Sequence, residues 1–139
     1  MERVLTEQFE TVEPDVDLVS VVRRMRETGA DDTVVVEGDE PVGVITYRDV
    51  AVRTYGEDRV SDDLTAEDVM TPDPVTITTN VGLIEAARMM SDTGVRRLPV
   101  VDSEGSLLGM LEAYDLTRLV ADELSEMLDE VIEAQRPRY

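Results

Sequence analysis

Residues 90–101 of this chain read MSDTGVRRLPVV, and residues 25–36, which lie 65 positions earlier, read MRETGADDTVVV. The same shift holds from Val4 onwards, and one extra residue in the second copy changes it to 66, so that Asp49 aligns with Asp115. A chance match would not keep its register over so many positions. The sequence is therefore a tandem duplication, and one structural unit used twice must account for the fold.

The segments before Gly29 and Gly94 have the pattern of an amphipathic helix. Apolar residues recur with the i, i+3, i+4, i+7 spacing that places them on one buried face. They are Leu18, Val21, Val22 and Met25 in the first copy, and Leu83, Ala86, Ala87 and Met90 in the second. Asp15 or Asp17 is expected to cap the first helix and Asn80 the second, and the two glycines are expected to end them.

Two short apolar runs follow each helix and predict a pair of strands joined by a turn. The runs are 33–36 and 42–46 in the first copy, and 98–101 and 107–111 in the second. A short extended segment, at 11–13 and 75–78, precedes each helix. A second helix is expected from about Tyr47 and from about Tyr114, and the latter runs towards Glu133. Each copy therefore predicts the order β-α-β-β-α.

These elements divide the chain into four parts. They are a first repeat at 1–55, a polar and acidic linker at 56–65, a second repeat at 66–123, and a C-terminal helix extension with a frayed tail at 124–139. A unit of this size would be only marginally stable alone. We therefore expect the two repeats to pack together about a pseudo-twofold axis, in an α/β fold of the α+β type.

The composition excludes several classes of function. No Cys or His is present, so disulfides, zinc sites with sulfur or imidazole ligands, and catalysis by Cys or His are excluded. The 139 residues include 13 basic and 32 acidic side chains, and the net charge of −19 opposes general binding to nucleic acid or to anionic membranes. No apolar stretch approaches the roughly 20 residues of a membrane span, and the acidic N-terminus lacks a signal-peptide pattern. A cytoplasmic location is expected.

The basic residues are unusual in kind, because all 13 are Arg and none is Lys. Dense carboxylates without lysine are typical of proteins from salt-in halophiles, where roughly molar salt shortens the Debye length to about 3 Å and screens self-repulsion. The alternative is an acidic protein encoded by a GC-rich mesophilic genome. We favour an origin in a halophilic archaeon, and we expect the protein to lose compactness in dilute buffer.

Three segments carry a resemblance to a known family. They are Asp68-Val69-Met70-Thr71 followed by Val75-Thr76-Ile77, the stretch from Gly94 to Asp102, and Gly43-Val44-Ile45-Thr46-Tyr47-Arg48-Asp49. Within a duplicated β-α-β-β-α unit, these segments resemble a pair of CBS domains, the tandem known as a Bateman module. The resemblance covers the chain from about Val4 to Val120.

The resemblance implies a cleft between the repeats that binds adenosine-containing ligands. In the family, the motif Gly-x-x-Thr/Ser-x-x-Asp holds the ribose, and Thr46 and Asp49 match it in the first copy. The segment before the second strand of the opposite copy contacts phosphate, and here it contains Arg96 and Arg97. This site suits an anionic nucleotide such as AMP, ADP or ATP. The adenine walls that the resemblance implies are Met70, Val75 and Ile45.

The second site that the resemblance implies has a different charge. Asp115 matches the ribose-binding Asp, but Glu112 stands in place of Thr or Ser, and the opposite segment contains Asp31 and Asp32. Phosphate would meet up to four carboxylates there, so we expect one nucleotide site and a degenerate second pocket. The acidic pocket could instead tolerate the sulfonium charge of S-adenosylmethionine.

Each candidate residue also has a simpler structural interpretation. Asp49 and Asp115 stand where a helix N-cap belongs, Arg96 and Arg97 could be solvated surface charge, and the apolar residues could be ordinary core. For Thr46 with Asp49, and for the arginine pair, we favour the ligand role. For Asp115 we favour capping.

No catalytic constellation or metal-ligand cluster stands out, so we expect a protein that is not an enzyme and that requires no cofactor or metal. We favour a stand-alone regulatory module that senses an adenosine-containing ligand and signals to an unidentified partner protein through the long acidic helix from Tyr114 to Glu133. The resemblance also implies a homodimer. The alternatives are a ligand-free scaffold for protein interactions and a sensor of S-adenosylmethionine or a cation.

Overall fold

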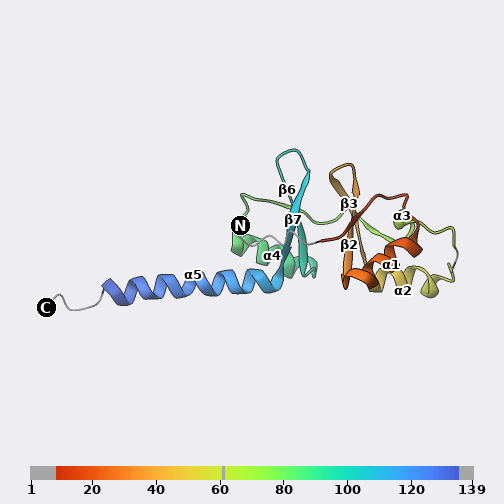
Figure 1. The fold of residues 1–139 in the computed structure, drawn as a ribbon. Helices are drawn as coiled ribbons and strands as arrows, with labels where there is room; N and C mark the ends of the chain where they lie inside the picture. The colour runs from red at the N-terminus through yellow and green to blue at the C-terminus, as the bar shows by residue number, and fades with distance from the viewer. Residues whose placement is uncertain (1–8, 61, 135–139) are drawn as a thin grey trace.

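The computed structural model describes residues 9–60 and 62–134. The expectations for Val4 and for the tail from Arg136 to Tyr139 lie outside the described residues. The two copies form two lobes that lie side by side, with the N-terminal lobe at the right of Figure 1. The last helix extends away from both lobes in the same view.

The N-terminal lobe contains the predicted order of elements. They are β1 (Thr11–Val12), α1 (Leu18–Thr28), β2 (Asp32–Glu37), β3 (Glu40–Thr46) and α2 (Tyr47–Arg53). Of the two proposed caps, Asp17 is the N-cap of α1. The helix ends at Gly29, whose φ of 73° is a left-handed conformation that glycine adopts without steric cost. The predicted apolar face is confirmed, since Leu18, Val21 and Met25 are buried.

The C-terminal lobe repeats this arrangement with one difference from prediction. Its elements are β5 (Ile77–Thr78), α4 (Leu83–Thr93), β6 (Arg97–Val101), β7 (Leu107–Glu112) and α5 (Ala113–Ala134). The N-cap of α4 is Gly82, so the prediction of Asn80 is wrong. The Thr78 hydroxyl donates to the Asn80 side chain, and Val81 N donates to the Thr78 carbonyl at 3.2 Å. Asn80 therefore belongs to a turn that precedes the helix.

Each lobe has its own sheet, and a strand from the chain that connects the two lobes is added to the first sheet. β2 pairs antiparallel with β3 and parallel with β1, and β6 has the same relation to β7 and β5. A further strand, β4 (Thr71–Pro72), pairs with β3. The connecting chain also forms η2 (Tyr55–Glu57) and α3 (Ala66–Val69), and Leu64, Ala66 and Val69 are buried in the N-terminal core. By its contacts, the segment from 64 to 72 belongs to the N-terminal lobe.

A small cluster of buried side chains joins the lobes. Val34 and Val36 of β2 pack with Met110 of β7, and Phe9 and Leu107 lie against them. The contact places one sheet against the other, as the duplication predicts. It also brings the end of β3 and the start of β6 to one cleft, because Thr46 and Arg97 line the same cavity.

Acidification is expected to weaken the start of α3. The Asp68 carboxylate accepts hydrogen bonds from Thr65 N at 2.8 Å and from the Thr65 hydroxyl at 3.1 Å. The backbone hydrogen bond from Thr65, followed by the Thr65 hydroxyl and the charge of Arg59, lowers the pKa of Asp68. Because the folded state then binds fewer protons than the unfolded chain, this contribution to stability is present above the unfolded pKa and is lost as the pH falls.

The measurement is the unfolding free energy of the wild type and of Asp68→Ala between about pH 6 and pH 2. The difference between the two proteins should be largest near neutral pH and shrink as the carboxyl protonates. A difference that stays constant over the whole range would contradict this interpretation. The comparison cancels the general repulsion among the many other carboxylates, since both proteins share it.

Candidate ligand site

A cavity of about 420 Å³ lies between the lobes, and both repeats line it. Of the residues predicted for this site, it brings together Thr46, Asp49, Val75, Arg96 and Arg97, and it also includes Asp32, which was predicted for the second pocket. It does not include two predicted adenine contacts: Ile45 is fully buried in the N-terminal core, and Met70 packs against that core.

The cavity also has residues that the sequence pattern did not single out. The polar ones are Thr71 and Asp73, and the apolar ones include Val44, Val95, Pro99 and Met110. Thr71 is the last residue of the family segment Asp68-Val69-Met70-Thr71, and this position is the signal that could have found it. Met110 gives no such signal, because it reaches the cleft only through the pairing of β7 with β6.

Asp49 is held by hydrogen bonds from two elements. Its Oδ2 accepts from Thr46 N at 2.9 Å and from the Thr46 hydroxyl at 3.0 Å, while Thr46 Oγ1 accepts from Asp49 N at 3.1 Å. This is a capping box at the start of α2. The other carboxylate oxygen, Oδ1, accepts from the Thr71 hydroxyl at 3.0 Å. The N-cap of α2 is Thr46, so the prediction of Asp49 as the N-cap is wrong: Asp49 completes the capping box from the third helical position, and it lines the cleft at the same time.

Arg97 makes an ion pair that crosses from one lobe to the other. Its two terminal nitrogens bind Asp32, and Glu112 at 2.8 Å. Asp32 begins β2 and Arg97 begins β6, so the pair joins equivalent positions of the two repeats. The Asp32 side chain is only 12% exposed, so the positive charge of Arg97 offsets the cost of burying this carboxylate. Most of the charge of Arg97 is therefore committed to protein carboxylates.

Arg96 differs from its neighbour. Its side chain is exposed, and it forms no ion pair with the residues that the structure describes. Its carbonyl accepts a hydrogen bond from Ala113 N at 2.8 Å, which ties this segment to the start of α5. Arg96 is thus the cation of the cleft that is available for an anionic group.

The second predicted pocket is a separate cavity of about 510 Å³. The structure brings Asp31, Asp32 and Glu112 to it, together with Glu10 and Arg97, but Asp115 is not among its lining residues. Asp115 lies partly buried in the first turn of α5, which begins at Ala113, so the prediction that Asp115 is the N-cap of this helix is wrong. Arg97 contacts two of these carboxylates and reduces their repulsion. Within 9–60 and 62–134, no group of acidic residues has an arrangement suited to a metal ion.

Both repeats of this chain match a known protein family. The family model described as CBS domain matches residues 1–53 and 66–122. Protein MK0525 of Methanopyrus kandleri is 34% identical over 110 residues, which are 78% of this chain and 56% of that protein. The chain thus spans just over half the length of this relative.

Two solved structures with a bound nucleotide are similar to this chain in fold. CBSX2 of Arabidopsis thaliana in complex with AMP superimposes with a TM-score of 0.75 and 25% identity, over 86% of this chain and 94% of that one. The cytosolic domain of the Mg²⁺ channel MgtE in complex with ATP superimposes with a TM-score of 0.72 and 25% identity, over 84% of this chain and 46% of that one.

No helix in the described part of this chain is long and apolar enough to cross a bilayer.

Proposed function

Because this chain belongs to the CBS-domain family, with one domain in each repeat, we propose that it is a regulatory module that binds an adenine nucleotide between its lobes and signals occupancy to a partner protein. The observation that carries the proposal is the cavity in which Thr46 and Asp49 of one repeat meet Arg96 of the other. A ligand that contacts both lobes stabilises one mutual orientation by its differential affinity for it.

The cavity suits a ligand with one polar and one apolar part. Its volume of about 420 Å³ falls within the usual range of small-molecule sites. Asp49 in the first turn of α2 can accept hydrogen bonds from ribose hydroxyls, and Arg96 can donate to a phosphate. We place the adenine against the apolar lining: Val44, Val75, Val95, Pro99 and Met110. Ile45 and Met70 then support this wall from the core.

The charge of the cleft favours a monophosphate over a triphosphate. Asp32, Asp49 and Asp73 line the cavity together with Arg96 and Arg97, and Arg97 is neutralised by its own carboxylate partners. One available guanidinium can balance a single phosphate group. The additional negative charge of ATP would face Asp73 without a further cation.

The second cavity supports a different ligand class. Its carboxylates, Glu10, Asp31, Asp32 and Glu112, disfavour phosphate and would tolerate the sulfonium of S-adenosylmethionine. We therefore keep a cationic adenosyl ligand as the second candidate function. A scaffold without a ligand is the third.

A thermal-shift series with adenosine, AMP, ADP, ATP and S-adenosylmethionine separates these candidates. AMP at about 100 times its Kd should add about 2.7 kcal/mol to the unfolding free energy, with smaller shifts for ATP at equal concentration. Stabilisation by S-adenosylmethionine alone would place the ligand site in the acidic cavity. If none of the five compounds changed the unfolding free energy, the scaffold without a ligand would be the remaining candidate function.

Replacement of Arg96 is expected to separate phosphate binding from nucleoside binding. Arg96→Ala removes a charge-assisted hydrogen bond of about 1.5–3 kcal/mol, so AMP should bind about ten- to a hundredfold more weakly while adenosine is little affected. Calorimetry measures both affinities. Arg88→Ala is the control, because Arg88 is exposed on α4 and does not line the cleft. Equal losses for AMP and adenosine would contradict a phosphate contact at Arg96.

We further propose that the protein is a homodimer whose stability depends on salt. With a net charge of −19 and no lysine, self-repulsion should weaken the folded state in dilute buffer and fade as salt approaches molar concentration. Circular dichroism and light scattering across a salt titration measure compactness and mass. An unchanged melting temperature and mass from about 0.05 M to about 2 M salt would count against the halophilic interpretation.

A further inference from the structure

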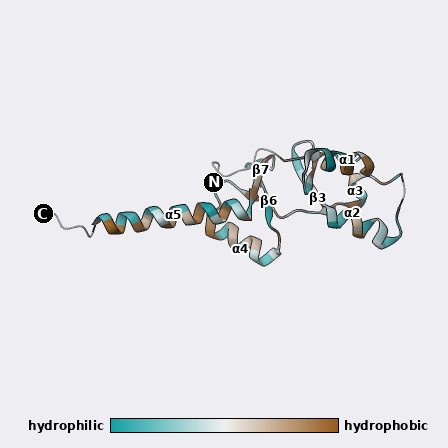
Figure 2. Cartoon of the chain, turned by 60° about the horizontal axis from the view of Figure 1, so that its bottom comes forward, coloured by the Kyte–Doolittle hydropathy of each residue, from teal (hydrophilic) through white to brown (hydrophobic). Residues whose placement is uncertain are grey.

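The outer half of α5, residues 121–134, carries an apolar stripe that the described chain leaves uncovered. Every residue in it is exposed, and the helix projects beyond both lobes (Figure 1). Five large apolar side chains recur at i, i+3, i+4, i+7 and i+8, with exposed fractions from 51% to 62%. They are Leu124, Met127, Leu128, Val131 and Ile132. Hydrophobic turns recur along this segment in Figure 2.

This segment needs a partner to be a stable helix. An isolated helix of this length is marginal in water, and most helical stability in proteins comes from packing of an apolar face. Leu116 and Val120 anchor the first turns of α5 in the C-terminal core. The stripe continues from these anchors along the same helix without a covering surface.

The charge of the segment restricts what can cover it. Residues 121–134 contain six acidic side chains and no basic one. They are Asp122, Glu123, Glu126, Asp129, Glu130 and Glu133. Packing two such helices against each other would bring like charges together, which disfavours an arm-to-arm pair. An apolar surface bordered by arginines fits both the stripe and its charge.

Such a surface exists on the N-terminal lobe. A groove of about 630 Å³ runs beside α1, and Val19, Tyr55 and Val60 line it with exposed fractions of 47%, 78% and 62%. Arg23 and Arg26 also line it, and neither forms an ion pair with a described residue.

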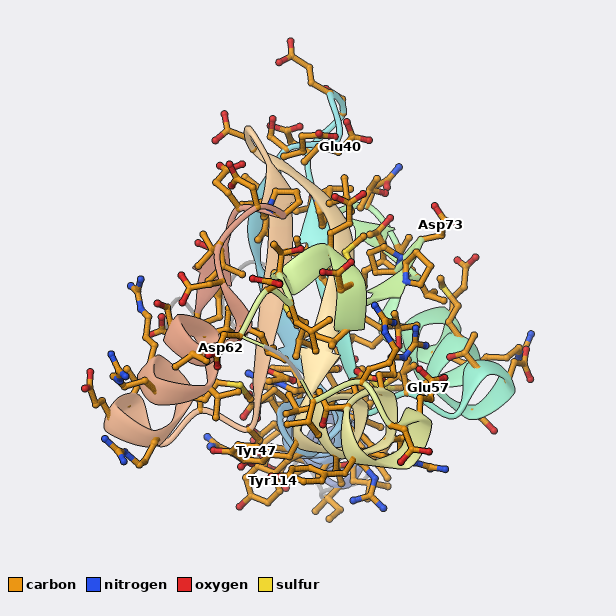
Figure 3. The ribbon with its side chains drawn as sticks, turned by 90° about the vertical axis from the view of Figure 1, so that its right-hand side faces the viewer. Glu40, Tyr47, Glu57, Asp62, Asp73 and Tyr114 are labelled. Atoms are coloured by element: carbon orange, nitrogen blue, oxygen red, sulfur yellow. The ribbon has the colours of Figure 1, made fainter. Side chains whose placement is uncertain are left out.

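Arginines are dense beside this groove, although the chain as a whole is strongly acidic. Arg23, Arg24 and Arg26 place three of the 13 basic residues within four positions, in a protein with 32 acidic ones. Arg24 is paired with Glu10 at 2.6 Å, which leaves the other two for the groove. Asp62 is the acidic member of the lining and lies beside α1 in Figure 3.

The arm of a chain cannot reach the groove of the same chain. The N-terminal lobe lies at one side of the C-terminal lobe, and α5 projects from the other (Figure 1). The outer half of α5 is about 20 Å long at 1.5 Å per residue, so it extends well beyond its own lobe. A second copy of the chain can supply the groove, and each copy then supplies one arm and one groove.

We propose that the outer half of α5 docks in the α1 groove of a second copy, and that the reciprocal contact closes an arm-exchanged dimer. Two equivalent contacts related by a twofold axis form a closed assembly that does not propagate. The contact buries the apolar stripe and sets Glu123 and Glu130 of the arm near Arg23 and Arg26 of the groove. The inference gives the proposed homodimer its interface, and it does not depend on which ligand occupies the cleft.

The first test is the mass of the full chain by light scattering in about 1 M salt. Leu128→Asp should raise the dimer dissociation constant by more than about a hundredfold, because each dimer loses two apolar contacts. Ile84→Asp is the matched control, since Ile84 is 65% exposed on α4 and lies in neither the arm nor the groove. A dimer that survives Leu128→Asp, or a wild-type chain that is a monomer, would overturn the proposal.

A reciprocal charge exchange tests the pairing itself. One variant carries Arg23→Glu with Arg26→Glu in the groove, and the other carries Glu123→Arg with Glu130→Arg in the arm. Each alone should be a monomer at about 0.15 M salt, because the substituted residues and the residues proposed to face them then carry charges of the same sign, while an equal mixture should form a heterodimer. Dimers of the groove variant alone would indicate arm-to-arm pairing and overturn the proposal.

Circular dichroism of each variant shows that it is folded before its mass is interpreted. AMP binding measured by calorimetry on the Leu128→Asp monomer keeps the two proposals apart. Retained binding by a monomer would support the interface and leave the ligand proposal intact. Loss of dimerisation in the control Ile84→Asp, with a dimer retained in Leu128→Asp, would place the interface on α4 and overturn the arm exchange.

Discussion

Arg97→Ala is expected to lower the unfolding free energy by about 2–3 kcal/mol. Removal of one partner from a buried ion pair typically costs about 3–5 kcal/mol, because the remaining charge is left buried and unpaired. Here the cost is reduced, since the side chains of Arg97 and Glu112 are 25% and 34% exposed. The remaining Asp32 carboxylate would be enclosed near Glu112 without a cation. Chemical denaturation in constant salt measures the change.

A double-mutant cycle identifies the pair as the cause. Asp32→Asn removes the charge that Arg97 balances, so Arg97→Ala should cost much less in that background. Arg88→Ala, which removes an exposed arginine from α4, should have little effect. If the cost of Arg97→Ala were the same with and without Asp32, the ion pair between the lobes would not be its source.

Asp49→Ala is expected to weaken both the protein and its affinity for AMP. Loss of the capping carboxylate at the start of α2 should cost about 0.5–2 kcal/mol of stability. Loss of a charged acceptor in the cleft should weaken AMP binding by about 1.5–3 kcal/mol, or roughly ten- to a hundredfold. Calorimetry of the folded variant measures the second effect separately from the first.

The chain contains a matched control for this variant. Thr65 and Asp68 form the same capping box at the start of α3, and Asp68 does not line the cavity. Asp68→Ala should therefore reduce stability by a similar amount and leave AMP affinity unchanged. Asp115→Ala should also leave it unchanged, since Asp115 lies outside both cavities. Equal losses of affinity in Asp49→Ala and Asp68→Ala would show that Asp49 acts on binding only through the helix.

The elements of each repeat could be predicted because each depends on local chemistry. Apolar spacing in 18–25 defines the buried face of α1, and Gly94, like Gly29, ends its helix by adopting a positive φ of 75°. The N-cap of α4 was missed because an Asn can satisfy a turn as readily as a helix end. The geometry of the Thr78 turn, which the sequence does not state, decides between them.

The role of each arginine could not be predicted from the sequence. Arg96 and Arg97 are adjacent and chemically identical, and both match the same family segment. Only the position of β6 turns Arg97 toward Asp32 and Glu112 and leaves Arg96 without an ion pair among the described residues. For the same reason, the sequence could not show that Glu112 lines the second cavity while Asp115 does not.

By itself, the sequence determined the duplication, the order of the elements in each repeat and the absence of chemistry that requires Cys or His. The order of the elements follows from apolar periodicity and from glycines, which act over a few residues, and the duplication follows from the match between the two copies. Tertiary structure alone decided which side chains from distant positions share a cavity, and which charges neutralise each other. Asp32 and Arg97 are 65 positions apart, and their contact exists only because Val34, Val36 and Met110 bury one sheet against the other.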